Sequence, residues 1–329
     1  MTQPAQEGSV VDVVIVAWNS AEVIGRCLQS LHEISNVRFN VYIVDNASGD
    51  GTPALIQPWV SSQIHLQSNP ANCGFSAACN QGARLGNSPF ILFLNPDCRP
   101  QPEAISAMLR VLDSTTSSVA VGGKLLHENG EPQVGFCFRS LPRFIDLCFE
   151  SLLINQAFPN NRWNRSYRLL NFPWDRDGEV EQPAGACFMI RRDIFEALGG
   201  FDESFFPAWF EDVDLFRRIK KQGYRVAFCA QAETVHIGGS SIAGMPAGGA
   251  TEHFFKNMIR YSAKAFGPWQ QRMIRLSVVV GMLVRLGAIL LSRRARARVS
   301  RGIRNGAASV VRRELRMAYC NVMKEALFQ

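Results

Sequence analysis

The sequence predicts an α/β protein in which helices cover both faces of a mostly parallel central sheet. Its 329 residues are 47% apolar and 19% charged, values that are typical of a globular chain. Between residues 10 and 123, short apolar runs alternate with segments of helical periodicity, as in parallel sheets with covering helices. The run Phe90–Leu94 is wholly apolar and too short for a typical helix, so it predicts a strand buried on both faces.

Strands are expected wherever a short apolar run ends in a polar turn. The clearest examples are 10–17, which only Asp12 interrupts, and Phe90–Leu94, which Pro96 ends because proline cannot donate to a strand ladder. The expected strands, in chain order, are 10–17, 41–45, 64–66, 90–94, 119–121, 186–190 and 225–229.

Helices are expected where apolar residues recur every three or four positions. Segment 21–32 has such a face, and Ser20 is expected to be its N-cap. Segment 75–85 is rich in alanine, which favours a helix. The remaining expected helices are 103–112, then 193–198, which Gly199 and Gly200 close, and 212–222, which precedes Gly223.

The rest of the chain is less regular. Residues 124–182 show no sustained period, and they are expected to form a long irregular insertion near the functional site. The segment 246–249 reads Pro-Ala-Gly-Gly, which predicts a linker, and the residues after it look helical. We therefore expect one domain at 1–245 and a helical, arginine-rich extension at 246–329.

Asp97 is the first candidate functional residue. It follows Phe90–Leu94 in the turn Asn95-Pro96-Asp97, so it should lie at the carboxyl end of a central strand. Open α/β sheets bind ligands at that edge. A carboxylate there is suited to a hard divalent cation that holds a diphosphate.

Two further segments point to a ligand at the same edge. Asp45 closes strand 41–45, where it can bind a base or a ribose, although the turn after it can also be a simple strand-to-helix connection. The segment Asn72-Cys73-Gly74 leads into helix 75–85, whose N-terminus suits a phosphate, but a tightly packed helix explains the same residues. The sequence has no GxGxxG or Walker loop, which disfavours Rossmann dehydrogenases and P-loop NTPases.

Acidic residues and a histidine follow later in the chain. Glu211 and Asp212 begin a helix just after several aromatic residues, among them Trp209. Acids in a first turn often only stabilise the helix dipole, but a carboxylate beside aromatic rings can be desolvated enough to act as a base. His236 precedes a glycine turn, where it is either structural or a ligand of a metal or phosphate.

Taken in order, these segments resemble the inverting glycosyltransferases of family 2, and most closely the rhamnosyltransferase-like branch. The resemblance covers residues 10–241 and implies a GT-A (nucleotide-diphospho-sugar transferase) fold. The segments that carry it are Val14-Ile15-Val16-Ala17-Trp18-Asn19, 44–52, Asn72-Cys73-Gly74-Phe75, Leu94-Asn95-Pro96-Asp97, 183–186, 199–206, 211–215 and His236.

The resemblance implies a role for each candidate. Asp212 would be the general base, and Asp97 and His236 would hold Mg²⁺ or Mn²⁺ on the donor diphosphate. Asp45 would bind the uracil or thymine ring. The other residues that it places on the nucleotide sugar are Ala17, Asn19, Gly74 and Asn95, and those that it places in the sugar and acceptor pocket are Trp209 and Glu211.

One departure from the family pattern bears on the donor. The commonest metal motif of this fold is Asp-x-Asp, whereas this chain has Asn95 at the first position. An amide oxygen carries no charge, so weaker metal binding is expected. The Asn-Pro-Asp form is familiar in the rhamnosyltransferase-like branch, which favours dTDP-rhamnose over a UDP-sugar as donor. The implied acceptor is a hydroxyl of a saccharide or a lipid-linked saccharide.

The positive charge is concentrated near the end of the chain. The net charge is +7, and nine arginines lie between residues 293 and 316. Before them, 274–291 is strongly apolar, but Arg275 and Arg285 interrupt it, which favours an interfacial helix with snorkelling arginines over a spanning one. We expect this tail to bind an anionic membrane surface rather than nucleic acid, with a packed core or oligomer helix as the alternative.

The nine cysteines form no CxxC pair, so they are expected to be reduced core residues. The polar N-terminus does not resemble a signal peptide. Together these features favour a cytoplasmic protein, peripheral at the inner face of the cytoplasmic membrane. The rival classes are a nucleotide-sugar pyrophosphorylase, which would carry a basic Gly-rich loop after the first strand, and a noncatalytic nucleotide- or sugar-binding module.

Overall fold

The computed structural model describes residues 11–115, 117–239, 245–291 and 305–328, which fall into two compact units. Unit 1 contains the described residues up to Leu141, the segment Arg168–Pro207, and the described residues from Glu211 to 239. Unit 2 contains Pro142–Tyr167, Ala208–Phe210 and the described residues from 245 onward. The two units are described separately below.

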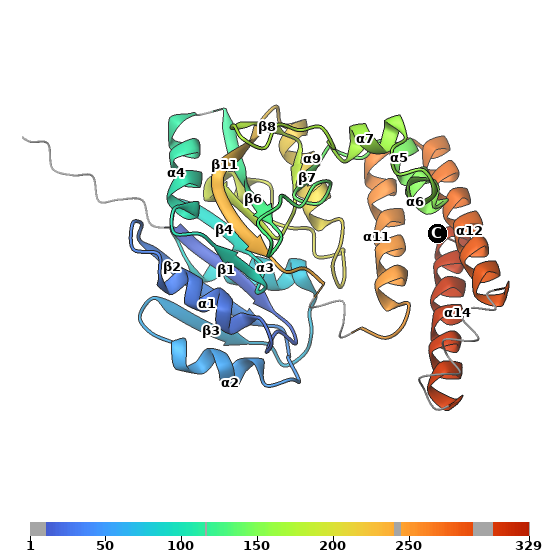
Figure 1. The fold of residues 1–329 in the computed structure, drawn as a ribbon, viewed down its shortest axis with the longest axis horizontal. Coiled ribbons are helices and arrows are strands. Elements are labelled where there is room, and N and C mark those ends of the chain that lie inside the picture. The colour runs from blue at the N-terminus through green and yellow to red at the C-terminus, as the bar shows by residue number, and fades with distance from the viewer. Residues whose placement is uncertain (1–10, 116, 240–244, 292–304, 329) are drawn as a thin grey trace, which may run out of the picture. The chain divides into compact units, whose positions relative to one another are not determined.

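A nine-stranded sheet forms the centre of unit 1 (Figure 1). Its order is β3-β2-β1-β4-β10-β6-β11-β5, with β8 paired to β11 beside this path. The strands are β1 (Val11–Ala17), β2 (Phe39–Asp45), β3 (Ile64–Ser68), β4 (Phe90–Leu94), β5 (Cys98–Pro100), β6 (Ser118–Leu126), β8 (Gly178–Val180), β10 (Cys187–Arg191) and β11 (Arg225–His236). A separate pair joins β7 (Phe138–Arg139) to β9 (Gln182–Pro183).

The sheet is mixed, but six of its nine strands run in one direction, so its main direction is the parallel one that was expected. β1 pairs in parallel with β2 and β4, β2 with β3, and β6 with β11. The exceptions are β10, which runs antiparallel between β4 and β6, and the short strands β5 and β8, which run antiparallel to β11. Because the parallel strands share one direction, their carboxyl ends form one edge of the sheet.

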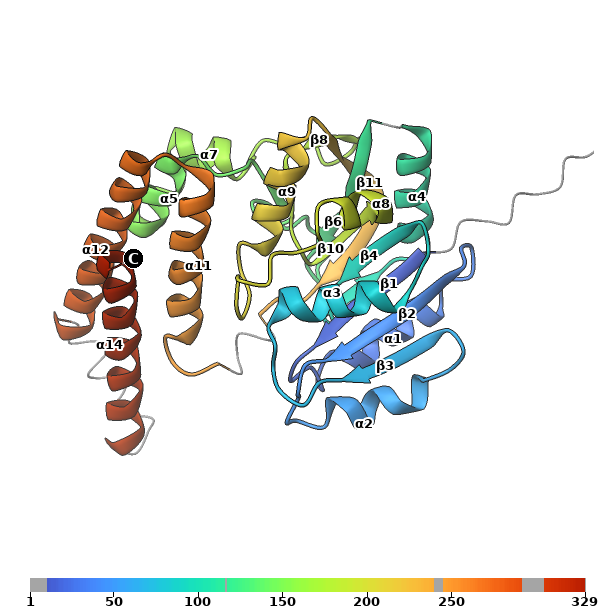
Figure 2. The ribbon, with the colours of Figure 1, turned by 180° about the vertical axis from the view of Figure 1, so that it is seen from behind.

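Helices cover both faces of the sheet. The helix α1 lies on the face toward the viewer in Figure 1, and α3 lies on the face toward the viewer in Figure 2. A Cβ atom at Gly82 of α3 would lie 2.5 Å from Val14 of β1, so only glycine permits this close approach. The helical segments of unit 1 are α1 (Ile24–His32), α2 (Thr52–Ile56), η1 (Gln57–Trp59), α3 (Phe75–Leu85), α4 (Ala104–Ser114), α8 (Arg192–Ala197) and α9 (Glu211–Lys221).

The one charged residue inside β1 has a complete set of partners. Asp12 is fully buried and accepts hydrogen bonds from Arg192 Nη2 (2.6 Å), Ser88 N (2.9 Å) and Ser88 Oγ (2.7 Å). The same guanidinium also donates to the Ser88 and Ala83 carbonyls. A buried carboxylate is costly unless it is paired and hydrogen-bonded, and this network meets both conditions. Asp12 therefore does not break the strand.

Two expectations about local structure are wrong, and one strand had not been expected. Ser20 does not cap α1: the N-cap is Val23, and the Ser20 hydroxyl pairs with Trp18 instead. The turn after Phe90–Leu94 leads directly into β5, which was not expected. The segment 124–182 is not one irregular insertion, because it contributes strands to unit 1 and three helices to unit 2.

Unit 2 consists of helices. They are α5 (Phe144–Ser151), α6 (Ile154–Ala157), α7 (Arg162–Tyr167), α11 (Gly249–Ala265), α12 (Pro268–Leu291) and α14 (Asn305–Phe328). The helix α12 packs against α5, α11 and α14, with Ile274, Val278 and Met282 fully buried. No helix in the described ranges has both the length and the apolar character that crossing a membrane requires.

Arg285 of α12 is part of this packing rather than a snorkelling residue. Its Nη1 donates to the carbonyl of Ser151, the last residue of α5, at 2.7 Å. Its guanidinium also lies 4.9 Å from the centre of the Phe255 ring. A cation is favourable at the carboxyl end of a helix. The expectation that Arg285 reaches toward a lipid headgroup is therefore wrong.

Candidate active site

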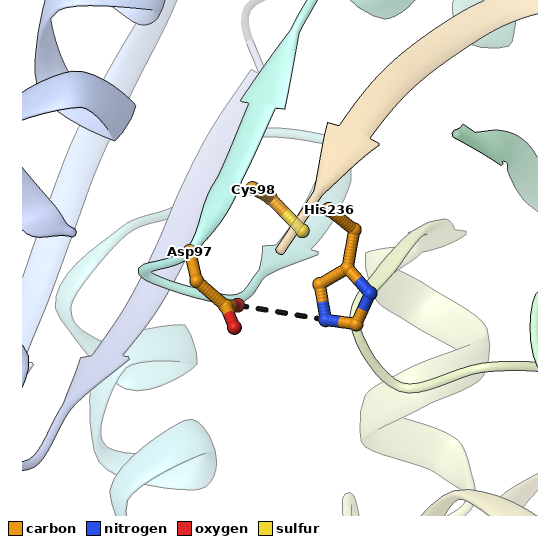
Figure 3. A group of neighbouring side chains, drawn as sticks. All are labelled: Asp97, Cys98 and His236. Atoms are coloured by element: carbon orange, nitrogen blue, oxygen red, sulfur yellow. Dashed lines mark ion pairs between the residues drawn. The ribbon is translucent and has the colours of Figure 1, made fainter. Parts of the chain in front are cut away.

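Asp97 and His236 meet at the carboxyl edge of the sheet (Figure 3). Asp97 lies in the turn between β4 and β5, and His236 ends β11, which pairs with β5 so that His236 lies opposite Cys98. His236 Nε2 is 3.5 Å from Asp97 Oδ1, and both side chains are buried. The backbone N–H of Gly238 donates to Asp97 Oδ2 at 3.0 Å, which fixes the carboxylate.

Gln133 determines which nitrogen of His236 carries the proton. Its Nε2 donates to the His236 carbonyl at 2.6 Å and to the Leu126 carbonyl at 3.3 Å, so its Oε1 must be the atom that faces the ring. That oxygen lies 2.9 Å from His236 Nδ1 and can only accept, so Nδ1 is the protonated nitrogen. Nε2 then presents a lone pair toward Asp97.

Burial keeps this imidazole neutral. Desolvation lowers the pKa of His236, and nearby His127 lowers it further, while Asp97 acts in the opposite direction. The Phe136 ring stacks on the imidazole with a centroid distance of 5.1 Å. Two hydrogen-bond acceptors, Asp97 Oδ1 and His236 Nε2, therefore face one another, an arrangement that a cation between them would stabilise.

Cys98 is close to this pair, but its chemistry does not suit the cation. The three side chains each have a ligand atom within 4.8 Å of the others. The Cys98 thiol, however, donates to the Ala186 carbonyl at 3.3 Å. Burial raises its pKa well above the usual value, which disfavours the thiolate that metals bind. Asp97 and His236 offer a carboxylate oxygen and an imidazole nitrogen. Mg²⁺ and Mn²⁺ prefer oxygen ligands, so the carboxylate is the main ligand for either cation.

The ends of β1 and β2 form a second part of the edge. Ala17 and Asp45 are register partners on these strands, and the Ala17 carbonyl accepts from Asn46 N. Asp45 Oδ2 accepts from Ser48 N at 3.2 Å, but Asp45 Oδ1 is buried and has no hydrogen-bond partner in the described part of the chain. A buried carboxylate oxygen without a donor is costly, so this atom suits a ligand N–H or O–H.

Asn19 and Gly74 border the same region. Asn19 joins the two loops, since its N–H donates to Ser48 Oγ (2.9 Å) and its Oδ1 accepts from Gly49 N (2.8 Å). Gly74 has a φ of +87°, and a Cβ there would lie 2.9 Å from the Phe206 ring. Glycine is therefore required at the start of α3 by both backbone conformation and space.

Asp212 lies in the first turn of α9 and is held by three donors. Its Oδ2 accepts from Gln182 Nε2 (3.0 Å) and Gly185 N (3.1 Å), and its Oδ1 accepts from Val213 N (2.7 Å). Desolvation raises the pKa of Asp212 above the usual range, against the opposing effect of these hydrogen bonds and of Arg139. A fixed carboxylate with a raised pKa is suited to accept a proton.

A two-residue segment connects Asp212 to the Asp97 turn. Gly185 N donates to Asp212, while the carbonyl of the next residue, Ala186, accepts from Asn95 N at 2.8 Å and from the Cys98 thiol. This follows from the sheet, because β10 runs antiparallel to β4 and Cys187 lies opposite Leu94. The carboxylate of α9 and the turn after β4 are thus tied to adjacent residues of one segment.

Comparison with protein families identifies the family to which this chain belongs. The model of glycosyl transferase family 2 matches residues 12–199, more than half of the chain, and that of the N-terminal domain of galactosyltransferase matches residues 167–238. The chain belongs to glycosyl transferase family 2. The resemblance inferred from its motifs is therefore confirmed.

Two relatives of this glycosyltransferase are named as rhamnosyltransferases. The N-acetylglucosaminyl-diphospho-decaprenol L-rhamnosyltransferase of Mycobacterium tuberculosis is 28% identical over 277 residues, covering 79% of this chain and 87% of that protein. The O-antigen chain rhamnosyltransferase of Salmonella anatum is 24% identical over 204 residues, covering 61% of this chain and 58% of that protein.

The fold of the glycosyltransferase is shared with solved structures. A mannosyltransferase from Pyrobaculum calidifontis, solved with GDP-Man and Mn²⁺, superposes with a TM-score of 0.54 at 16% identity. The match covers 96% of this chain and 86% of that protein. This confirms the GT-A fold expected from the sequence.

The remaining candidates of the glycosyltransferase lie in different places. Glu211 is buried at the start of α9, next to Asp212. Asn95 contributes backbone contacts, with its N–H to Ala186 and its carbonyl accepting from Cys98 N. Trp209 is half-buried, has a φ of +77° and belongs to unit 2.

Three residues that support the site were missed from the sequence. Gln133 orients His236, and Gln182 and Gly185 hold Asp212. Gln133 and Gln182 lie in the stretch without periodicity, and glutamine is usually exposed, so nothing in the pattern distinguishes them. Gly185 lies in Pro183-Ala184-Gly185-Ala186, which the resemblance did include, and that was the one available signal.

Proposed function

We propose that this glycosyltransferase moves a sugar from a nucleoside diphosphate donor to an acceptor hydroxyl with inversion at the anomeric carbon. The observation that carries the proposal is the position of the Asp212 carboxylate, which Gly185 holds while the next residue, Ala186, holds the turn bearing Asp97. The oxygen of the acceptor hydroxyl attacks the anomeric carbon from the face opposite the leaving diphosphate. Asp212 takes the proton of that hydroxyl in the same displacement. No enzyme nucleophile is required, because one displacement inverts the stereochemistry.

The donor nucleotide is assigned to the ends of β1 and β2. The unpartnered Asp45 Oδ1 accepts from the imide N–H of uracil or thymine, which satisfies a buried acceptor. Ala17 and Asn19 border the base and ribose, and Gly74 allows the backbone at the start of α3 to approach the donor. Asn95 lies in the turn that faces the diphosphate.

Asp97 and His236 are assigned to the diphosphate end of the donor. They would hold Mg²⁺ or Mn²⁺, which when bound neutralises the charge that the leaving diphosphate gains. The residues themselves supply a fixed carboxylate and a neutral imidazole whose Nε2 lone pair Gln133 keeps in place. Glu211 is assigned to the sugar and acceptor pocket.

The names of the relatives favour rhamnose as the transferred sugar. The donor that we propose is therefore dTDP-rhamnose, with a UDP-sugar as the second choice. They also favour a saccharide or lipid-linked saccharide acceptor, as in the assembly of cell-envelope polysaccharide or glycolipid. We assign the chemistry to residues 1–245 and membrane association to 246–329. An enzyme with such an acceptor works at the inner face of the cytoplasmic membrane, where the arginines between 293 and 316 would meet anionic lipid.

A donor panel tests the proposed reaction. The protein is mixed with dTDP-rhamnose, UDP-glucose, UDP-N-acetylglucosamine or GDP-mannose and with short-chain lipid diphosphate saccharides. We expect release of nucleoside diphosphate, fastest from dTDP-rhamnose, with Mg²⁺ or Mn²⁺ and none with EDTA. NMR of the product reports the anomeric configuration. If no donor yields nucleoside diphosphate with either cation, the proposal fails, and formation of pyrophosphate from sugar phosphate and dTTP would identify a pyrophosphorylase.

The Asp45→Asn variant tests the base contact. The amide can still accept from Ser48 N, but its NH₂ group would face the imide N–H, so an attractive contact becomes repulsive. Hydrogen bonds to charged groups contribute about 1.5–3 kcal/mol, so we expect dTDP to bind about 10- to 100-fold more weakly in calorimetry. The exposed Asp113→Asn on α4 is the control. Unchanged affinity of the Asp45 variant would remove the base from this position.

A further inference from the structure

The helix α12 is apolar on two opposite faces, and unit 2 covers only one of them. Its buried face contains Ile274, Val278 and Met282, none of which is exposed. The other face carries large apolar side chains that are 40–59% exposed. We call this face the α12 surface, and its residues are Trp269, Met273, Leu276, Val280, Leu283 and Val284.

The spacing of these residues makes one continuous stripe. Trp269, Met273, Leu276, Val280 and Leu283 follow one another at intervals of four, three, four and three, which keeps them on one side of a helix. From Trp269 to Val284 the stripe runs about 22 Å at 1.5 Å per residue. Scattered exposed apolar residues are ordinary, but a helix that is apolar all round is normally covered on every side.

The charges on α12 identify what covers the stripe. The helix contains no aspartate or glutamate, and Arg272 and Arg275 lie on its N-terminal half beside the stripe. A second copy of the chain on this face would bring arginines toward arginines. An anionic bilayer instead accepts the apolar side chains below its headgroups and pairs its phosphates with the guanidinium groups. Trp269, at one end of the stripe, is a residue type that favours the membrane interface.

We propose that α12 is an interfacial membrane-docking helix that inserts the α12 surface into an anionic lipid leaflet. It lies in the plane of the membrane, with its stripe immersed and Arg272 at headgroup level. The opposite face of α12 stays packed within unit 2, where Arg285 donates a hydrogen bond to the carbonyl at the end of α5. This inference rests on the proposed function in one respect. A lipid-linked acceptor is the reason why the enzyme would need to bind a bilayer.

Vesicle binding by the full-length protein tests this docking helix. Sedimentation with phosphatidylcholine vesicles containing about 30 mol% phosphatidylglycerol is compared with pure phosphatidylcholine. The triple variant Met273→Gln, Leu276→Gln, Leu283→Gln should reduce the partition coefficient about tenfold or more, since it removes apolar surface that the lipid would bury. The triple variant Leu55→Gln, Val60→Gln, Leu85→Gln, at similarly exposed positions of unit 1, should bind as the wild type does.

A second measurement places the helix directly. The fluorescence of the wild type should shift to the blue on anionic vesicles, and the Trp269→Phe variant should lose that shift. The proposal is overturned if the α12 variant binds vesicles as the wild type does, or if wild type ignores anionic vesicles. A dimer in analytical ultracentrifugation that the α12 substitutions dissociate would also overturn it, in favour of an interface between copies.

Activity in solution keeps this result separate from the proposed function. Release of nucleoside diphosphate from dTDP-rhamnose with a short-chain acceptor requires no vesicle, so both triple variants should retain the wild-type rate. Loss of activity toward a long-chain acceptor in vesicles, with the short-chain rate intact, is the result expected for a docking helix. If the wild type transfers no sugar, the proposed function is contradicted. The vesicle measurement still tests the docking helix, because it does not depend on activity.

Discussion

Replacement of Asp212 by Asn is expected to lower turnover by about 10²-fold or more while the donor still binds. The carboxylate is the fixed acceptor for the hydroxyl proton, and an amide cannot take that proton. Calorimetry with dTDP measures donor binding, and single-turnover transfer measures the chemical step. Near-wild-type transfer by the variant would show that another group is the base.

The pH dependence of the same reaction provides a second readout. Because desolvation raises the pKa of Asp212, its base form is populated only above that raised value. Turnover should therefore fall, as the pH is lowered, at a higher pH than an ordinary carboxyl group would give. In the Asn variant the residual rate should lose this acidic limb.

Asp193 offers a matched control for the Asp212 substitution. It lies in the first turn of α8, and its Oδ1 accepts from the N–H of the next residue at 2.9 Å, as Asp212 Oδ1 does from Val213. Asp193→Asn removes a comparable interaction with a helix N-terminus, but it lies on the exposed surface. We expect it to keep wild-type turnover, which separates the helix effect from the proton transfer.

Loss of the divalent cation is the second large effect that we expect. Asp97→Asn removes the only charge of the Asp97–His236 pair, and affinity for Mn²⁺ in the presence of dTDP should fall about 10- to 100-fold or more, with a parallel loss of transfer. Electron paramagnetic resonance measures free Mn²⁺ and does not depend on activity. Wild-type Mn²⁺ affinity in this variant would exclude Asp97 as a ligand.

Two neighbouring residues make the metal assignment specific. Gln133→Ala removes the acceptor that fixes the His236 ring, and about tenfold weaker Mn²⁺ binding is expected because orienting partners have effects of that size. Cys98→Ser keeps a donor toward the Ala186 carbonyl and should leave the affinity unchanged, since the thiol is not a ligand in this assignment. A large loss on replacing Cys98 would contradict the assignment.

The parts of the fold that follow from local pattern were predictable. The bounds of Phe75–Leu85 and Phe90–Leu94 agree with the structure, because an alanine-rich amphipathic stretch and a wholly apolar run each favour one conformation. The helices at 144–167 were missed because they are short, between four and eight residues, and α5 is stabilised by packing against α12. The pattern of a short segment carries too little information to reveal a partner more than a hundred residues away.

The candidate site was predictable to the extent that residues stand at strand ends. Asp45 ends one parallel strand and Asp97 comes just after another. Their position at the same edge of the sheet could therefore be predicted from the alternation of strands and helices. The protonation of His236 could not be predicted, because it depends on Gln133, 103 positions away. Likewise, the contact between Asp212 and Gly185 depends on β10 entering the sheet antiparallel to β4, a direction that no local pattern specifies.

The adjacent residues Gly185 and Ala186 set the distance between the two parts of the proposed reaction. The N–H of Gly185 holds the residue assigned to receive the proton, and the carbonyl of Ala186 holds the turn assigned to the leaving group. The separation of these two backbone groups is set by covalent geometry rather than by side-chain packing. Engineering of the acceptor or donor specificity can therefore change loops around this edge without changing that separation. An insertion or deletion between β9 and β10 would instead change the distance between the proposed base and the turn assigned to the leaving group.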